Sequence, residues 1–217
     1  MSRPTVLIVA KSPEPGRAKT RVAQTVGDEV AADLAAAALL DTLEVAGSVG
    51  WPVVVALTGD LDRAARSSEI REALARVKVV AQRGGGFAER LVAAHNDADE
   101  GFGVVQVGMD SPQLAVTDLL LAGQALGIHD AAIAPAEDGG WWLLALRSSI
   151  HAKVLADVPM STADTCRATI DALTENGAHV FGLRALRDVD TWADALALAQ
   201  AYPRLRSSKV VRQVVGR

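Results

Sequence analysis

The sequence predicts an α/β fold with a mixed, mostly parallel sheet, and three observations lead to that prediction. Short runs rich in Val, Leu and Ile recur without polar alternation, which is typical of strands covered on both faces. Longer stretches rich in Ala and Leu lie between most of them, with apolar residues at helical spacing. One connection, the six residues PAEDGG, is too short for a helical crossover and indicates a local break from the parallel pattern.

The elements follow one another in a regular order. The apolar runs predict strands at 5–10, 53–57, 77–81, 104–108, 131–134, 141–146 and 179–183. The helical stretches occupy 28–50, 61–77, 87–100 and 118–127. No internal repeat or low-complexity linker interrupts the pattern, so we expect a single domain over 1–217. The basic segment at about 203–217 is expected to be a solvated terminal helix or a frayed tail, with anion binding or a homodimer contact as the alternatives.

Composition excludes several classes of protein. Proteins that bind nucleic acids or anionic membranes normally present a positively charged surface to them. The formal net charge of −4 therefore argues against both kinds of partner. The single cysteine, Cys166, excludes an internal disulfide framework and is compatible with a reducing compartment. The first apolar run ends before Lys11 and is too short for a signal peptide or a membrane span. We therefore expect a soluble, cytoplasmic protein.

The stretch AKSPEPGRAKTR, residues 10–21, directly follows the first predicted strand. Ligands of open α/β sheets bind beyond the carboxyl ends of strands, so this basic loop is well placed to hold a phosphate. It does not match a Walker A loop, because Pro13 and Ala18 occupy the glycine positions. The alternative is a solvated basic loop that opens a helix. The phosphate-binding candidates are Lys11, Gly16, Arg17, Lys19, Thr20 and Arg21.

The same loop resembles a known family. AKSPEPGRAKTRVA is similar to the opening of a bacterial family of GT-A-type glycosyltransferases, in the nucleotide-diphospho-sugar transferase superfamily. AKTR also resembles the loop of 2-phospholactate guanylyltransferases, and the arrangement is similar to that of molybdenum-cofactor guanylyltransferases. The motifs QRGGGFAERL, GMDSPQL, APAEDGGWWLLAL, PMSTADT and DVDTWAD follow in order, over roughly residues 5–195. The resemblance implies a three-layer α/β/α sandwich of the GT-A type and an enzyme of the transferase class.

Three aspartates are candidates for a metal site. Asp110 follows the run VVQVG, and the resemblance implies that it binds Mg²⁺ or Mn²⁺, which suits a carboxylate shared with substrate phosphates. Its alternative is a turn or cap acid. Asp188 and Asp190 lie on one face of an extended segment. Either Asp190 or Thr191 fits the helix N-cap with Asp194 completing a capping box, so we favour Asp188 as the second ligand and keep Asp190 as an alternative.

The glycine-rich motif predicts nucleotide contacts. Three glycines leave room for a base or ribose, and the Gln82 amide can both donate and accept toward a base edge. In the superfamily this region contacts the nucleobase. Arg90 reaches back to a phosphate or pairs on its own helix surface. The nucleotide candidates from this motif are Gln82, Gly84, Gly85, Gly86 and Arg90.

The remaining motifs predict the acceptor side. The motif EDGG is typical of an ordinary turn. Alternatively it binds the acceptor, with Asp138 as a general base and Trp141 and Trp142 forming a wall of the site. STADT fits an N-cap at Ser161, although its hydroxyls also suit an acceptor phosphate. The histidines show no metal spacing, so we assign them no chemistry. The acceptor candidates are Glu137, Trp142, Ser161 and Thr162, and the catalytic candidates are Lys19 and Asp138.

Two reactions fit a metal-held nucleotide. A phosphate nucleophile is already anionic and needs no base, whereas glycosyl transfer to a hydroxyl needs a carboxylate such as Asp138. The number of cations favours a triphosphate, so we favour nucleotidyl transfer from a nucleoside triphosphate to a phosphate monoester of a small-molecule acceptor. Glycosyl transfer from a nucleotide sugar is the alternative. Non-catalytic nucleotide binding is a second alternative, disfavoured by the four aspartates Asp110, Asp138, Asp188 and Asp190.

Overall fold

The computed structural model describes residues 3–216, and every predicted strand is present. The strands are β1 (Thr5–Lys11), β2 (Val53–Thr58), β3 (Lys78–Ala81), β4 (Val104–Gly108), β5 (Ala131–Pro135), β6 (Trp141–Leu146) and β7 (Val180–Gly182). The helices are α1 (Thr20–Val26), α2 (Asp28–Ser48), η1 (Leu61–Arg63), α3 (Ser67–Leu74), α4 (Phe87–Ala98), α5 (Val116–Ala125), η2 (Ser149–Asp157), α6 (Thr165–Glu175), α7 (Trp192–Ala201) and α8 (Arg206–Val215). The helical stretch predicted at 61–77 is interrupted, because Arg66 adopts a left-handed conformation between η1 and α3.

The strands form one mixed sheet in the order β3-β2-β1-β4-β6-β5-β7. All neighbouring pairs are parallel except those of β6, which runs antiparallel to both β4 and β5. The break predicted from the short connection PAEDGG is therefore confirmed. The carboxyl ends of all the parallel strands meet at one edge, and the turn between β5 and β6 joins them there.

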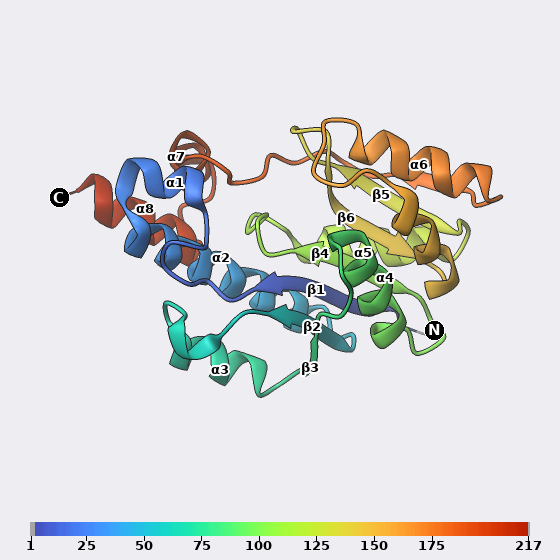
Figure 1. The fold of residues 1–217 in the computed structure, drawn as a ribbon, viewed down its shortest axis with the longest axis horizontal. Helices are drawn as coiled ribbons and strands as arrows, with labels where there is room; N and C mark the ends of the chain where they lie inside the picture. Colours follow the sequence, from blue (N-terminus) through green and yellow to red (C-terminus); the bar gives the residue numbers. More distant parts are fainter. Residues whose placement is uncertain (1–2, 217) are drawn as a thin grey trace.

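Helices cover both faces of the sheet (Figure 1). On one face, α2, α3 and α5 pack through Leu39, Ile70 and Leu119. On the other, α4, η2 and α6 pack against the sheet through residues such as Leu91 and Leu155. Full burial of a Leu or Ile side chain is worth about 1.5–3 kcal/mol, which explains why the inner strands of the sheet are apolar on both faces. The fold is the predicted three-layer α/β/α sandwich.

A second cluster joins the end of the chain to α1 and α2. Val22, Leu34, Leu198 and Val210 are buried together there, so residues 206–215 of the basic segment form a helix docked on α2. None of the helices in residues 3–216 has the length and apolar character that a membrane crossing needs. The single-domain organisation stays a prediction.

Candidate active site

The basic loop between β1 and α1 is anchored on the end of β2. Ser12 Oγ donates to the Asp60 carbonyl at 2.7 Å, and the buried Glu14 carboxylate accepts from the Asp60 amide at 3.1 Å. A Cβ on Gly59, which has a φ of +94°, would lie 2.7 Å from Ser12 Cβ, so the two segments approach closely. The loop is therefore held in place before its cations reach the site.

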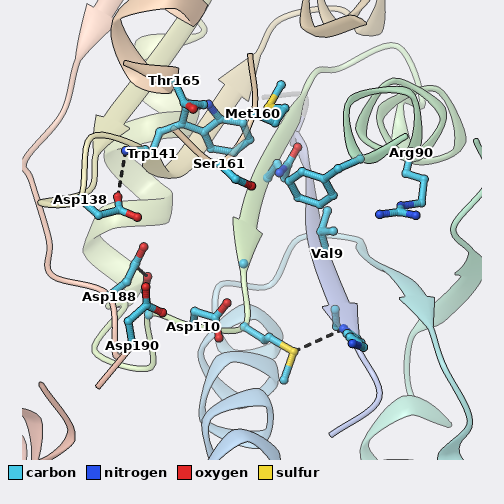
Figure 2. Close-up of a pocket in the computed structure, with 18 of the residues that line it drawn as sticks. Val9, Arg90, Asp110, Asp138, Trp141, Met160, Ser161, Thr165, Asp188 and Asp190 are labelled. Carbon is cyan, nitrogen blue, oxygen red and sulfur yellow. Dashed lines mark hydrogen bonds between the residues drawn. The ribbon is translucent and has the colours of Figure 1, made fainter. Parts of the chain in front are cut away.

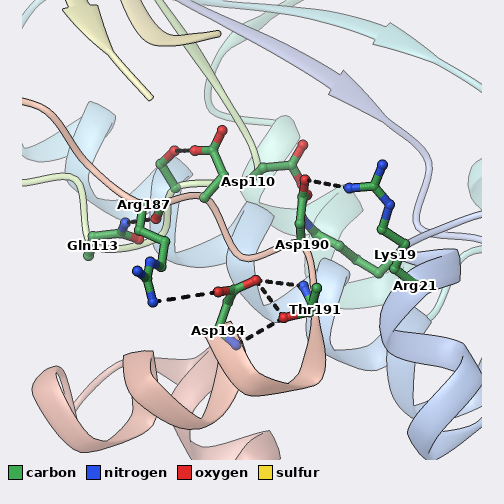
Figure 3. A network of polar contacts seen from close by, with 10 residues as sticks. Lys19, Arg21, Asp110, Gln113, Arg187, Asp190, Thr191 and Asp194 are labelled. Atoms are coloured by element: carbon green, nitrogen blue, oxygen red, sulfur yellow. Dashed lines mark hydrogen bonds and ion pairs between the residues drawn. The ribbon is translucent and has the colours of Figure 1, made fainter. Parts of the chain in front are cut away.

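Lys19 meets two of the predicted metal ligands directly. Its Nζ lies 2.6 Å from Asp110 Oδ1 and 3.6 Å from Asp190 Oδ1, and its side chain is only 8% exposed. Arg21 Nη1 lies 3.4 Å from the other Asp190 oxygen (Figure 3). Lys19 also has a left-handed conformation, with a φ of 48°, at the start of α1. The fold thus brings the cations of the first loop against carboxylates from two later loops.

Two adjoining cavities meet at these residues. We call the larger one, of about 550 Å³, the loop pocket, because the predicted cations Lys11, Arg17, Lys19 and Arg21 line it with Thr20. The inner pocket, of about 480 Å³, extends over the α4 face of the sheet. Both volumes fall within the range of small-molecule sites. The residues shared by the two pockets are Lys11, Met109, Asp110, Asp138, Ser161, Thr162 and Asp190.

Four aspartates gather around this junction (Figure 2). Burial, together with the neighbouring Asp110 and Asp138, raises the pKa of Asp188 to about 6. The Ser111 hydroxyl, which donates to Asp188 Oδ1 at 2.6 Å, and Lys19 act against that rise. The raised pKa thus comes mainly from burial, with a smaller effect of the two neighbouring carboxylates.

The donor set fits a divalent cation that shares its ligands with a substrate. Among residues 3–216, no three His, Cys, Asp or Glu side chains are already arranged to hold a metal ion. The three-carboxylate set Asp110, Asp188 and Asp190 is therefore not preformed. Magnesium is commonly held by one or two carboxylates, phosphate oxygens and water, and the carboxylates gathered at the pocket junction suit such an ion.

Of the two residues predicted as alternatives for the N-cap of α7, Thr191 is the cap and Asp190 is not. Thr191 is the N-cap, where its Oγ1 accepts from the Asp194 amide at 3.3 Å and the Asp194 carboxylate accepts from the Thr191 amide at 2.8 Å (Figure 3). Asp190 is left facing Lys19 and Arg21. The reason for preferring Asp188 to Asp190 as a ligand is thereby removed.

The N-cap predicted at Ser161 is also wrong. Helix α6 begins at Thr165, with Asp164 in the capping position and no side-chain cap. Ser161 instead has a φ of 60°, and the Thr165 hydroxyl accepts from the Thr162 amide at 3.0 Å. Ser161 and Thr162 line both pockets, which is where an acceptor contact needs them.

The β5–β6 turn combines the two interpretations of EDGG. Asp138 Oδ1 accepts from the Gly140 amide at 2.9 Å, as in an ordinary turn, while Asp138 also lines both pockets. A Cβ on Gly139, with a φ of +90°, would lie 2.0 Å from the Ala163 carbonyl oxygen, so glycine is required. Glu137 is not part of the site, because it pairs with Arg187 at 2.7 Å and lines neither pocket.

The two tryptophans of β6 face opposite sides of the sheet. Trp142 is 3% exposed, packs in the core and donates through Nε1 to the Arg184 carbonyl, so its prediction as an acceptor contact is wrong. Trp141 lines the inner pocket and donates to Thr169 Oγ1 at 3.2 Å. The alternation of side chains along a strand accounts for the difference.

The predicted nucleotide contacts are only partly brought to the pockets. Gln82 lines the inner pocket, but its Nε2 donates to the Ala10 and Ala56 carbonyls at 2.9 Å, which leaves only its Oε1 for a ligand. Arg90 also lines the inner pocket, 5.8 Å from the centre of the Phe87 ring. The predicted glycines Gly16, Gly84, Gly85 and Gly86 line neither pocket.

Several residues that line the pockets were not predicted from the sequence. Gln106 is a lone polar residue inside the apolar strand β4, and that isolation was a signal that could have found it. Ser111, which holds Asp188, directly follows Asp110 and carried no separate signal. Other residues of the inner pocket that were not predicted include Thr58, Phe87, Met109, Met160 and Thr165.

Residues 39–162, more than half of the chain, match a family model described as "Uncharacterized protein conserved in bacteria (DUF2064)". The chain belongs to the DUF2064 family. The stretch that matches this DUF2064 model contains Asp110 and Asp138, but neither the basic loop nor Asp188 and Asp190. No curated protein matches the chain.

Solved structures resemble the DUF2064 chain over its whole length. A protein assigned as a nucleotide-diphospho-sugar transferase from Desulfovibrio desulfuricans G20 is 28% identical, with a TM-score of 0.89 over 100% of this chain and 96% of that one. A nucleotidyl transferase from Methanothermobacter is 15% identical, with a TM-score of 0.60 and coverages of 94% and 99%. Rv0371c from Mycobacterium tuberculosis H37Rv is 21% identical, with a TM-score of 0.55 and coverages of 91% and 98%. The fold is that of nucleotide-diphospho-sugar transferases, and these names support an enzyme of the transferase class.

Proposed function

We propose that this DUF2064 protein is a metal-dependent nucleotidyltransferase that joins a nucleotide from a nucleoside triphosphate to a phosphate monoester. One observation carries the proposal: Lys19 Nζ lies between Asp110 and Asp190 where the loop pocket meets the inner pocket. A polyphosphate and its divalent cation need a cation and carboxylates at the same point. The junction provides both, with a cavity on either side for the two substrates.

The basic loop is the phosphate-binding part of the proposed site. Lys19, Arg17 and Arg21 supply charged donors, which form stronger hydrogen bonds to phosphate than neutral donors do. Lys11 Nζ donates to the Arg17 carbonyl at 3.3 Å and lines both pockets. When a phosphate binds, Lys19 can exchange a carboxylate partner for a phosphate oxygen without leaving the junction. This exchange places its charge where negative charge develops during transfer.

Asp110, with Asp190 or Asp188, would hold the Mg²⁺ or Mn²⁺. The bound ion would neutralise phosphate charge and orient the triphosphate. Two structural neighbours support this part of the proposal, since Rv0371c was solved in complex with manganese and a CMP:2-keto-3-deoxy-manno-octonic acid synthetase with CTP. The phosphate monoester would bind near Ser161 and Thr162. Its anionic oxygen needs no general base.

Glycosyl transfer is the second candidate, and Asp138 favours it. Asp138 lines both pockets, while its Oδ1 accepts from Gly140, so Oδ2 is the oxygen that can take a proton from an acceptor hydroxyl. The name of the Desulfovibrio desulfuricans structure supports the same candidate. The resemblance to the guanylyltransferases supports nucleotidyl transfer instead. A cytoplasmic location and a homodimer remain predictions.

A substrate panel tests the proposal. The protein is incubated with each nucleoside triphosphate or nucleotide sugar, with Mg²⁺ or with a chelator, and with a set of phosphate monoesters. Pyrophosphate release from a triphosphate supports nucleotidyl transfer, and nucleoside diphosphate release from a nucleotide sugar supports glycosyl transfer. Ligand at 100 times its Kd adds about 2.7 kcal/mol of stability, so thermal shifts detect binding without turnover. If no nucleotide shifts the melting temperature or turns over in Mg²⁺, the transferase proposal fails.

A further inference from the structure

Gln106 is a polar residue buried in the middle of the sheet. It is 3% exposed and lines the inner pocket from strand β4. Val105 and Val107, its neighbours along the strand, pack in the core on the opposite face, so the side chain of Gln106 points toward the α4 face. An amide buried without partners is costly, and strand β4 is otherwise apolar. The position therefore calls for an explanation beyond packing.

His95 of α4 fixes the orientation of that amide. The imidazole is fully buried, and its Nε2 lies 2.8 Å from Gln106 Oε1. Burial lowers the pKa of His95 to about 4, so the ring is neutral at pH 7. The buried Nδ1 has no partner among the described residues, and an orphan acceptor is less unusual than an orphan N–H. The proton therefore lies on Nε2 and is donated to Gln106 Oε1.

This hydrogen bond turns the NH₂ group of Gln106 toward the pocket. The residues that the structure describes offer Gln106 Nε2 no hydrogen-bond partner. A ligand that reaches this point of the inner pocket meets two N–H donors and no acceptor from Gln106, because the carbonyl oxygen is already used. Reversing the amide would place its NH₂ against His95 and lose that hydrogen bond to the imidazole N–H.

Arg90 supplies further donors in the same pocket. It lies on α4, ahead of His95, and forms no ion pair within residues 3–216. Its Nε is buried without a hydrogen-bond partner. Figure 2 shows Arg90 and Trp141 on opposite sides of the pocket. The acidic residues lie at the junction with the loop pocket, so the end near Arg90 and Gln106 is richer in donors.

We propose that Gln106 and Arg90 form a subsite for a ligand group that presents acceptor atoms, with His95 as the positioning residue. The proposal rests on the proposed transferase function and names the chemistry that the inner pocket selects. A carbonyl or carboxylate oxygen fits these donors. It has two sources: a nucleobase edge such as guanine O6 or uracil O4, or a carboxylate on the second substrate. Adenine and cytosine place an exocyclic amine at the corresponding position and leave the donors unpaired.

The first arm of the test measures base preference. Dissociation constants for GTP, UTP, ATP and CTP are measured in Mg²⁺ by calorimetry on the wild type, Gln106→Glu and Gln106→Leu. If the base is the source, the wild type binds GTP or UTP at least tenfold more tightly than ATP and CTP. Gln106→Leu lowers that ratio, and Gln106→Glu, which replaces the donor with an acceptor, lowers it further. His95→Leu reduces the same ratio, which a purely structural role would leave unchanged.

The second arm measures carboxylate preference. The probes are 3-phosphoglycerate and glycerol 3-phosphate, two phosphate monoesters of which only the first has a carboxylate. If the second substrate is the source, the wild type binds 3-phosphoglycerate at least tenfold more tightly, and Gln106→Leu removes the difference. Gln113→Leu is the matched control, because Gln113 is also buried, donates to the Arg187 carbonyl and lies outside the inner pocket.

The outcomes separate the two proposals. If nucleotides bind in Mg²⁺ but neither ratio departs from one, or if both Gln106 variants keep the wild-type ratios, the subsite proposal is overturned and the transferase function stands. If no nucleotide binds the wild type, the transferase function fails. The phosphoglycerate ratio then decides the subsite by itself.

Discussion

Asp41 and Asp110 both pair with a cation, but their oxygens are used differently. Asp41, whose side chain is 3% exposed, accepts from the amides of Arg206 and Ser207 and from the Ser207 hydroxyl, at 2.8–3.0 Å. These bonds dock the start of α8 on α2. Asp110, 51% exposed, has Lys19 Nζ as its side-chain partner. A structural carboxylate here has its lone pairs filled, whereas the carboxylate of the candidate site keeps them available for a ligand.

Replacing Lys19, the cation that pairs with Asp110, is expected to have the largest effect of the predicted substitutions, and the effect is a loss of activity. Lys19→Ala should lower kcat about 10²–10³-fold, the usual loss when one donor to developing charge is removed. The free energy of unfolding should fall by only about 1 kcal/mol, because Asp110 and Asp190 are about half exposed and can be solvated when the Lys19 side chain is removed. Steady-state kinetics and urea denaturation measure the two effects. Lys78→Ala, at a lysine that donates to the Asp97 carbonyl, is the control. A kcat within threefold of the wild type would contradict the assigned role.

His95 differs from both aspartates, because it is a buried titratable group with no charged partner in contact. Its pKa falls from the ordinary 6.5 to about 4, through burial against a smaller opposing effect of Gln106. Between those values the unfolded chain binds a proton that the folded chain does not. The free energy of unfolding should therefore decrease as pH falls from 6.5 to 4, by about 3 kcal/mol from this residue.

The pH prediction needs a matched variant, because Asp188 acts in the opposite direction. Its raised pKa, about 6, makes the folded chain bind a proton as pH falls, and this offsets the loss at His95. Urea denaturation in the presence of a chelator should show that His95→Gln loses less stability on acidification than the wild type. Equal losses in the two proteins would mean that His95 is not buried in its neutral form.

Replacing Asp41, the structural aspartate, should have the opposite result to replacing Lys19: a loss of stability without a loss of binding. Asp41→Ala removes three acceptor contacts at the start of α8 and should cost about 2–3 kcal/mol of stability. Metal-dependent nucleotide binding should be unchanged, because Asp41 lines neither pocket. Thermal denaturation and calorimetry test the two halves. Asp41→Asn keeps one acceptor oxygen and should lose less. Weaker nucleotide binding in a folded Asp41→Ala protein would break the distinction between the two kinds of carboxylate.

The strands and the gathering of the site were predictable because both depend on chain order. Strands covered on both faces must be apolar, and this is visible in the inner strands β1, β2, β4, β5 and β6, whereas the edge strands β3 and β7 are largely exposed. Parallel strands place their carboxyl ends at one edge, so residues that follow them are brought together. Lys19 and Asp110 were identified from that rule, and they lie 2.6 Å apart.

The misassigned residues depend on details that chain order does not specify. Trp141 and Trp142 are adjacent and chemically alike, and only the register of β6 decides which one reaches the pocket. The Gln82 amide group is bound by backbone carbonyls of two neighbouring strands, which no local pattern reveals. Glu137 finds Arg187, fifty positions further along the chain, and so leaves the site.

The smallest predicted effect separates two adjacent residues that the sequence left interchangeable. Thr191 caps α7 and Asp190 faces Lys19, so Thr191→Ala should cost about 1 kcal/mol of stability and leave metal-dependent nucleotide binding intact. Asp190→Ala should do the reverse, since it keeps the capping box with Asp194 but removes a carboxylate from the junction. Denaturation of both variants with and without Mg²⁺ and nucleotide distinguishes the roles. If Asp190→Ala lost the stability and Thr191→Ala lost the binding, the chain here would be shifted by one residue from the arrangement described, and Asp188 would again be the better ligand.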